Sequence, residues 1–124
     1  MEPDSLRTKG GYFPIDKLNL YREAIQKILG DYSDRRSDEN IESQAIFDLK
    51  RDHYQVVNVG WLNGKRVYGC VLHLDIKNGK IWLQYNGTEI DIGQELVALE
   101  VPKTDIVLGF QAPHRRKYTD YAVS

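Results

Sequence analysis

Three Asn-Gly pairs, at positions 63–64, 78–79 and 86–87, separate stretches of the chain in which apolar and polar residues alternate. Asn-Gly favours the two-residue type I′ turn of a β-hairpin, because both central residues of that turn need a positive φ. Alternation with a period of two is typical of strands that bury one face. Turns at these strand-length intervals therefore predict an antiparallel meander.

The alternating runs around these turns are predicted to be strands, at residues 41–48, 53–61, 65–77 and 80–85. The third run is expected to present two faces: Tyr68, Cys70, Leu72, Leu74 and Ile76 on one, and Val67, Val71, His73 and Asp75 on the other. A last strand is predicted at residues 105–112, with Ile106, Leu108 and Phe110 on one side, and Pro113 ends it.

Between residues 16 and 32 the apolar spacing changes to three and four, which is typical of an amphipathic helix. The apolar stripe consists of Leu18, Tyr21, Ile25, Ile28, Leu29 and Tyr32. Asp16 is the predicted N-cap, Gly30 is expected near the end of the helix, and residues 33–40 are expected to form a loop. A second, short helix is predicted after Asp91, which forms a variant of the capping box with Gln94.

Together these elements predict an α+β fold, in which an N-terminal helix packs on an antiparallel β-meander and a short helix and a final strand follow. The chain has 124 residues, the size of one domain. Residues 1–14 carry Pro and Gly without an apolar period, so they are predicted to be a flexible N-terminal extension, and residues 15–124 a single domain. The second face of the sheet also carries apolar residues, which favours self-association, most commonly as a dimer.

Composition narrows the classes of function. The formal net charge of −1 counts against a chain that binds DNA by itself, since such proteins are usually basic. The one cysteine, Cys70, permits no disulfide within the chain and is interpreted as a small core residue, which fits a reducing, cytoplasmic setting. The sequence shows neither an apolar run of roughly 20 residues nor the features of a signal peptide, so no membrane is expected as a partner.

No motif specifies an active site. Asp75-Ile76-Lys77 has the D-x-K form of some metal-dependent nucleases, but Asp48-Leu49-Lys50 has it too, so a solvated strand end is the favoured interpretation. His53, His73 and His114 lack the spacing of a metal-binding motif, and no compact set of ligands is apparent. We therefore predict no catalytic residue, no metal and no cofactor, with a metal-dependent nuclease as a remaining alternative.

Two groups of residues are candidate binding surfaces. Trp61 and Trp82 either anchor an interface, where tryptophan is enriched, or pack in a core, and the sequence favours neither. The basic segment near the C-terminus is a candidate for phosphate contact and consists of Arg115, Arg116, Lys117 and Tyr118. Because three charges are few, pairing with acidic surface groups is the favoured interpretation of this segment.

Longer runs carry a resemblance over about residues 15–124. They are Asp16-Lys17-Leu18, Tyr21-Arg22-Glu23, Arg51-Asp52-His53-Tyr54-Gln55, Val59-Gly60-Trp61, Arg66-Val67-Tyr68-Gly69-Cys70, His73-Leu74-Asp75-Ile76-Lys77, Gly79-Lys80-Ile81-Trp82, Gly87-Thr88-Glu89, Glu95-Leu96-Val97, Val101-Pro102-Lys103 and Asp105-Ile106-Val107-Leu108. In these runs the chain resembles the XisI family. It departs from the family at Ile15, where members typically begin with Met, and at Leu99-Glu100, where Ala-Gly is frequent.

The resemblance implies an accessory controlling factor for excision of the fdxN DNA element, a site-specific recombination event catalysed by a separate recombinase. It also implies a companion, XisH, that resembles nuclease folds, and it transfers no catalytic residue. The leading hypothesis is a non-enzymatic regulatory partner of a XisH-like protein, in a homodimer or hetero-complex and only indirectly linked to the recombinase machinery. The candidate partner contacts are Trp61, Arg66, Tyr68, His73 and Trp82. Direct nucleic-acid binding through residues 115–118 is the main alternative.

Overall fold

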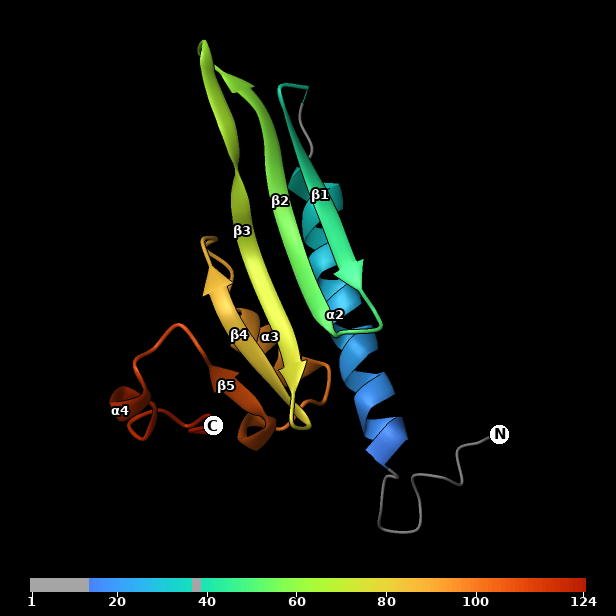
Figure 1. Cartoon of the computed structure of the whole chain (residues 1–124), viewed down its shortest axis with the longest axis vertical. Helices are drawn as coiled ribbons and strands as arrows, with labels where there is room; N and C mark the ends of the chain where they lie inside the picture. Colours follow the sequence, from blue (N-terminus) through green and yellow to red (C-terminus); the bar gives the residue numbers. More distant parts are fainter. Residues whose placement is uncertain (1–13, 37–38) are drawn as a thin grey trace.

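The computed structural model describes residues 14–36 and 39–124. Its sheet has five strands in the order β1-β2-β3-β4-β5, antiparallel except for the parallel pair β4–β5 (Figure 1). The elements are α2 (Pro14–Arg36), β1 (Ile41–Asp48), β2 (His53–Leu62), β3 (Lys65–Lys77), β4 (Lys80–Asn86), α3 (Ile92–Ala98), a 3-10 turn (Lys103–Asp105), β5 (Ile106–Leu108) and α4 (Pro113–Arg116). The predicted α+β architecture is confirmed. The predicted extension at residues 1–14 lies outside the described residues, except for Pro14.

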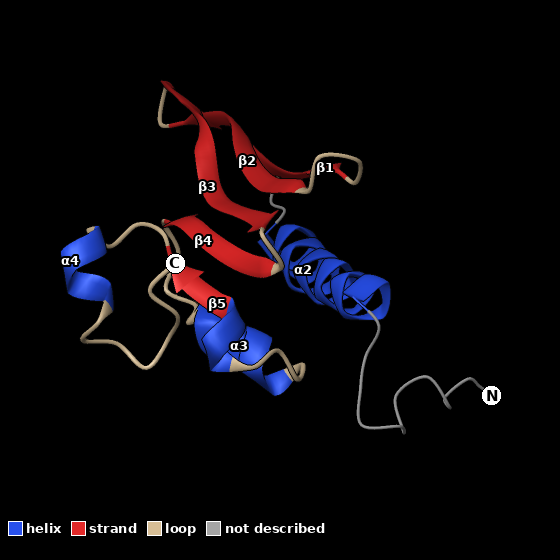
Figure 2. Ribbon diagram, turned by 60° about the horizontal axis from the view of Figure 1, so that its bottom comes forward, coloured by secondary structure: helices blue, strands red, loops and turns tan. Residues whose placement is uncertain are grey.

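Helices α2 and α3 lie on one face of the sheet, and the hydrophobic core fills the space between them (Figure 2). The predicted stripe of α2 is confirmed, because its central members Tyr21, Ile25 and Leu29 are buried in this core. The sheet and α3 contribute the other fully buried side chains, which include Tyr54, Val56, Leu72, Leu74, Ile81, Ile92, Leu96 and Ile106. The opposite face of the sheet carries no long helix in the described part of the chain, and we call it the helix-free face.

Helix α2 is longer than the sequence predicted. It begins at Pro14, so the predicted N-cap Asp16 instead lies in its first turn, where the helix dipole stabilises a carboxylate. It also continues past Gly30 to Arg36, into the predicted loop, because Tyr32 is buried and holds the last turns against the core. That burial outweighs the cost of about 1 kcal/mol that a glycine imposes on a helix. No helix in the described residues combines the length and apolar character needed to cross a membrane.

A β-bulge in β3 corrects the predicted faces of that strand. Val56 pairs with Leu72, but the next residue, Val57, pairs with Cys70, so Val71 is an extra residue without a partner on β2. The bulge reverses the alternation. Cys70 and Tyr68 therefore lie on the helix-free face with His73 and Asp75, whereas Val71 packs against the core and Val67 leaves the face predicted for it. The half-buried Cys70 is thus not part of the main core, and burial raises the pKa of its thiol.

The loop after β4 shows how the third Asn-Gly pair is used. Asn86 Oδ1 accepts a hydrogen bond from the backbone N–H of Thr88 (2.9 Å), and its Nδ2 donates to the Ile90 carbonyl (2.8 Å). The turn therefore leads into α3 and not into another hairpin. Asp91 caps α3 as predicted, since its Oδ1 accepts from the backbone N–H of Gln94 at 3.1 Å.

The last strand is shorter than predicted and runs parallel to β4. After Leu108 the chain turns, because the backbone N–H groups of Gly109 and Gln111 donate to the carbonyls of Val107 and Leu108. Phe110, predicted to share a face with Ile106 and Leu108, therefore lies outside β5 and is 49% exposed. The chain then returns along β5, where Ala122 forms a β-bridge with Val107.

The ion pair between Arg22 and Asp52 ties α2 to the β1–β2 connection. Arg22 donates from two nitrogens to the two Asp52 oxygens (2.8 and 3.1 Å), and the Tyr54 hydroxyl donates to Asp52 as well (2.8 Å). The Arg22 hydrogen bond, aided by Tyr54 and opposed by burial, lowers the pKa of Asp52 below its ordinary value of 3.8.

Replacing Asp52 by asparagine is expected to lower the free energy of unfolding at pH 7 by about 2 kcal/mol, because hydrogen bonds to a charged group are lost. Asparagine tolerates the positive φ of 60° at this position, so backbone strain does not confound the result. Since the pKa is lower in the folded chain, the contribution is fully present above the unfolded pKa and disappears as pH falls through the folded one. The difference in stability between the two proteins should therefore begin to shrink near about pH 4 and vanish only below the lowered folded pKa. Urea denaturation measures this, with Asp31→Asn in the exposed Lys27–Asp31 pair as control; equal effects of both substitutions would contradict it.

Candidate functional site

The helix-free face collects all five residues predicted to contact a partner. The strand register places Trp61 beside Arg66, and Tyr68 beside Val59. Further along the same face His73 pairs with Gln55, and Trp82 pairs with Asp75 of β3. Directly paired residues share a face of the sheet. The structure therefore brings the five residues to one surface, although they divide into an exposed distal group and a more covered proximal group.

The distal group occupies the free end of the β2–β3 hairpin, and we call Trp61, Arg66 and Tyr68 the hairpin surface. Trp61 is 58% exposed and Tyr68 is 71% exposed. The Arg66 guanidinium lies over the Trp61 ring, 5.5 Å from its centroid. Strand β4 pairs only with residues 72–77 of β3, so the distal half of β3 has β2 as its sole neighbouring strand among the described residues. Figure 1 shows this end of the hairpin extending past the end of α2.

In the middle of the same face lies a cluster of His53, His73 and Asp75, which we call the histidine cluster. Asp75 Oδ1 is 2.8 Å from His53 Nδ1 and 2.9 Å from His73 Nε2. Gln84 Nε2 donates to Asp75 Oδ2 at 3.1 Å, and Gln55 Nε2 lies 3.4 Å from His73 Nδ1. Burial raises the pKa of the Asp75 carboxyl, but the hydrogen bonds from His53, Gln84 and His73 outweigh it and hold the pKa below its ordinary value.

The expectation that the histidines and carboxylates offer no compact set of ligands was wrong for two of the three histidines. The donor atoms of His53, His73 and Asp75 all lie within 4.8 Å of one another. These residues converge through strand pairing, because His53 lies opposite Asp75 on the neighbouring strand and His73 lies two residues from Asp75. Motif spacing along the chain carries no sign of such a group. The supporting residues Gln55 and Gln84 were missed for the same reason.

Trp82, at the proximal end of this face, packs the C-terminal segment onto the sheet. Two cations contact its ring, with Lys77 Nζ 4.3 Å and the Arg116 guanidinium 5.3 Å from the centroid. The buried indole Nε1 has no hydrogen-bond partner within residues 14–36 and 39–124. Lys77 therefore contacts an aromatic ring, while the Asp75 carboxylate is held by histidines. The placement of the Lys77 amine at the Trp82 ring differs from the lysine beside the reacting group that the D-x-K alternative requires.

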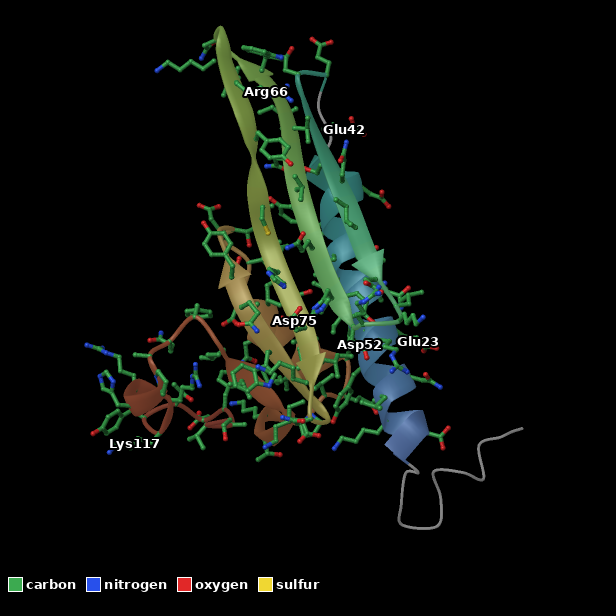
Figure 3. All side chains as sticks on the ribbon, viewed as in Figure 1. Glu23, Glu42, Asp52, Arg66, Asp75 and Lys117 are labelled. Atoms are coloured by element: carbon green, nitrogen blue, oxygen red, sulfur yellow. The ribbon has the colours of Figure 1, made fainter. Side chains whose placement is uncertain are left out.

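The basic C-terminal residues have unequal roles. Arg116 donates to three backbone carbonyls, those of Gln111 (3.1 Å), Gly109 (3.3 Å) and Val123 (3.4 Å), so its guanidinium stabilises the C-terminal segment. Arg115 and Lys117 are exposed, and Lys117 Nζ lies 5.3 Å from the ring centroid of Tyr118, which is 79% exposed. Figure 3 places Lys117 far from Arg66, so the basic segment and the hairpin surface are separate candidate surfaces.

Comparison with known proteins identifies relatives along nearly the whole described chain. The family model described as XisI protein matches residues 15–123. The solved structure of a XisI-like protein from Anabaena variabilis ATCC 29413 is 51% identical, with a TM-score of 0.79, over 84% of this chain and 96% of that chain. The solved structure of the fdxN element excision controlling factor XisI from the same organism is 37% identical, with a TM-score of 0.77, over 87% of this chain and 99% of that chain. The comparison with curated protein sequences returned no match. With the family model covering most of its length and two solved structures sharing its fold, this chain belongs to the XisI family.

Proposed function

We propose that this chain is a non-enzymatic accessory factor in the control of DNA excision and that it acts by binding a XisH-like protein. The excision role is supported by family membership and by the 37% identical relative described as an fdxN element excision controlling factor. The mode of action is supported by one observation above all, the exposed aromatic side chains of the hairpin surface. Breakage and rejoining of DNA would then belong to a separate recombinase.

The hairpin surface has the composition of a protein-binding site. Tryptophan, tyrosine and arginine are the residues most enriched among those that dominate binding energy. Trp61 and Tyr68 are more than half exposed, so the fold does not use them as core residues. The contact of Arg66 with the Trp61 ring restrains both side chains before binding, which reduces the entropy lost on association. The matching partner surface would offer an apolar pocket with a carboxylate near Arg66.

The other two candidate contacts, His73 and Trp82, support this surface less directly. The side chain of His73 is 30% exposed and is engaged in the histidine cluster, and Trp82 is half-buried under the C-terminal segment. The proposal therefore rests on Trp61, Arg66 and Tyr68, and it places His73 and Trp82 at the margin of the contact.

Co-expression with a XisH-like protein, followed by size-exclusion chromatography with light scattering, tests the proposal. A stable complex is expected, and the same run on the chain alone reports whether it forms a homodimer. Trp61→Ala and Tyr68→Ala are each expected to weaken binding by roughly 30-fold, the loss typical of a dominant interface residue. Tyr118→Ala, which removes another highly exposed tyrosine in the separate basic segment, serves as the matched control. Absence of a complex, or a loss confined to Tyr118→Ala, would refute the proposal.

Direct nucleic-acid binding is the second candidate, and the exposed Lys117–Tyr118 pair beside Arg115 is the observation that favours it. An aromatic ring and two cations on one short segment suit a single-stranded or flexible nucleic acid. A gel shift that weakens with salt and is abolished by Arg115→Gln with Lys117→Gln would support this reading. A shift unaffected by those substitutions, or none at low salt, would exclude it.

A further inference from the structure

We propose that His53, His73 and Asp75 form a binding site for a divalent transition-metal ion of the zinc class on the helix-free face. Two imidazole nitrogens and a carboxylate oxygen converge there from the neighbouring strands β2 and β3. This ligand set suits zinc and its neighbours, whereas magnesium and calcium prefer sites made of oxygen alone. The inference concerns a different part of the face from the hairpin surface and does not depend on the proposed partner.

The distances show that the site is nearly preformed. Ligand atoms around a tetrahedral zinc ion lie roughly 3.3 Å apart, given metal–ligand bonds of about 2.0–2.1 Å. Asp75 Oδ1 is already 2.8 Å from His53 Nδ1 and 2.9 Å from His73 Nε2, and all three donor atoms lie within 4.8 Å of one another. A tetrahedral ion therefore requires the two His–Asp separations to widen by about half an ångström and the two imidazole nitrogens, which lie within 4.8 Å of each other, to be about 3.3 Å apart. Such a shift is within reach of side-chain rotation alone.

The surrounding residues support the ligands as the outer partners of a metal site do. Gln84 fixes the carboxylate by donating to Asp75 Oδ2, the oxygen that the histidines do not contact. Gln55 faces His73 Nδ1 across 3.4 Å. When His73 Nε2 offers its lone pair to the ion, the ring proton resides on Nδ1, and the Gln55 amide accepts it after exchanging its oxygen and nitrogen positions.

Exposure and charge at the cluster also suit an ion. The Asp75 side chain is only 9% exposed and is the most buried of the three proposed ligands. The side chains of His73 and His53 are 30% and 54% exposed and lie nearer to solvent. Lys77, two residues from Asp75 on β3, directs its amine to the Trp82 ring. Three protein ligands leave a fourth position of the ion open toward solvent. That position is able to hold water or a side chain from another molecule.

Titration of the untagged full chain, stripped with a chelator, tests the site. Calorimetry with zinc chloride is expected to show one equivalent bound, and cobalt chloride to produce the visible d–d absorption of a four- or five-coordinate ion. His53→Gln and His73→Gln are each expected to reduce the zinc affinity at least tenfold. His114→Gln, which changes an exposed histidine on α4, should bind zinc like the unchanged chain, and magnesium chloride should not compete.

Three results would overturn the proposal. They are the absence of stoichiometric zinc binding, zinc affinities of the His53→Gln and His73→Gln variants equal to that of the unchanged chain, and a loss of affinity in His114→Gln as large as in those two variants. Circular dichroism confirms that each variant is folded. His53→Gln is the safer variant because its side chain is more than half exposed, so a loss of zinc binding in this folded protein reports on the site itself.

Discussion

Replacing Leu74 by alanine is expected to lower the free energy of unfolding by about 3–5 kcal/mol, the cost of deleting a fully buried leucine and leaving a cavity. Leu74 has no solvent exposure and lies in the last third of β3, between Tyr54 of β2 and Leu83 of β4, on the face that α2 and α3 cover. Because the Leu74 side chain is fully enclosed by the packed core, little collapse into the cavity is available. Domains of this size are typically stable by about 5–15 kcal/mol, so the substitution removes a large part of the margin.

Thermal unfolding followed by circular dichroism measures this effect, with an expected drop in Tm of roughly 10–20 °C. Leu62→Ala is the matched control, since Leu62 is 48% exposed near the hairpin turn and its truncation is expected to change stability by no more than about 0.5 kcal/mol. A Leu74→Ala protein that melts with the Leu62→Ala protein would mean that the core packs differently from the structure described.

Replacing Gly60 by alanine is expected to destabilise the protein by about 3 kcal/mol, at the upper end of the usual cost of overpacking. A Cβ at this position would lie 2.1 Å from the Asn40 carbonyl oxygen and 2.8 Å from the Ile41 Cα. Both neighbours are backbone atoms, so no side-chain rotation relieves the clash and the start of β1 must move. That movement also breaks the hydrogen bond from the Trp61 backbone N–H to the Asn40 carbonyl, 3.1 Å long.

Gly69→Ala provides the comparison, because Gly69 lies on β3 opposite Asn58 and a Cβ there meets no heavy atom within 4 Å. That substitution is expected to be neutral or slightly stabilising, since alanine loses less backbone entropy than glycine. Chemical denaturation gives the two stabilities, and hydrogen exchange at the Trp61 amide reports the local opening in Gly60→Ala. If the two alanine variants were equally stable, β1 would shift without an energetic cost. The close approach of β1 to Gly60 would then not limit which residue this position accepts.

The functional surfaces depend on these structural features. The hairpin surface stands at the end of a long pair of strands whose base is held by the core around Leu74. Strand β1, whose start lies against Gly60 of β2, supports the same hairpin from its other edge. A loss of partner binding in Trp61→Ala therefore reports on the interface only if the free energy of unfolding is unchanged. The Leu62→Ala and Gly69→Ala variants show how small a change in stability a substitution in this hairpin is expected to cause.

The sequence by itself determined the elements of this protein. Asn63-Gly64 and Asn78-Gly79 form the predicted hairpin turns, with positive φ at all four residues, because few other residue pairs adopt that conformation without strain. The spacing of apolar residues identified α2 and its buried stripe, and the long runs from Asp16 onward indicated the XisI family. The exposure of Trp61 and the half-buried position of Trp82 were left undecided, because alternation gives a residue's face but not what covers that face.

Only the tertiary structure decided the register of the strands and which segments cover each face of the sheet. Counting back from the Asn63-Gly64 turn in a regular hairpin would place His53 opposite Leu74, and the bulge at Val71 shifts it by one residue to Asp75. A bulge leaves no sure mark in a run of apolar residues, so the histidine cluster could not be foreseen. The parallel pairing of β5 and the packing of Arg116 on Trp82 likewise arise from contacts between distant segments. Local preferences thus fixed where strands and turns form, while long-range pairing set which side chains meet.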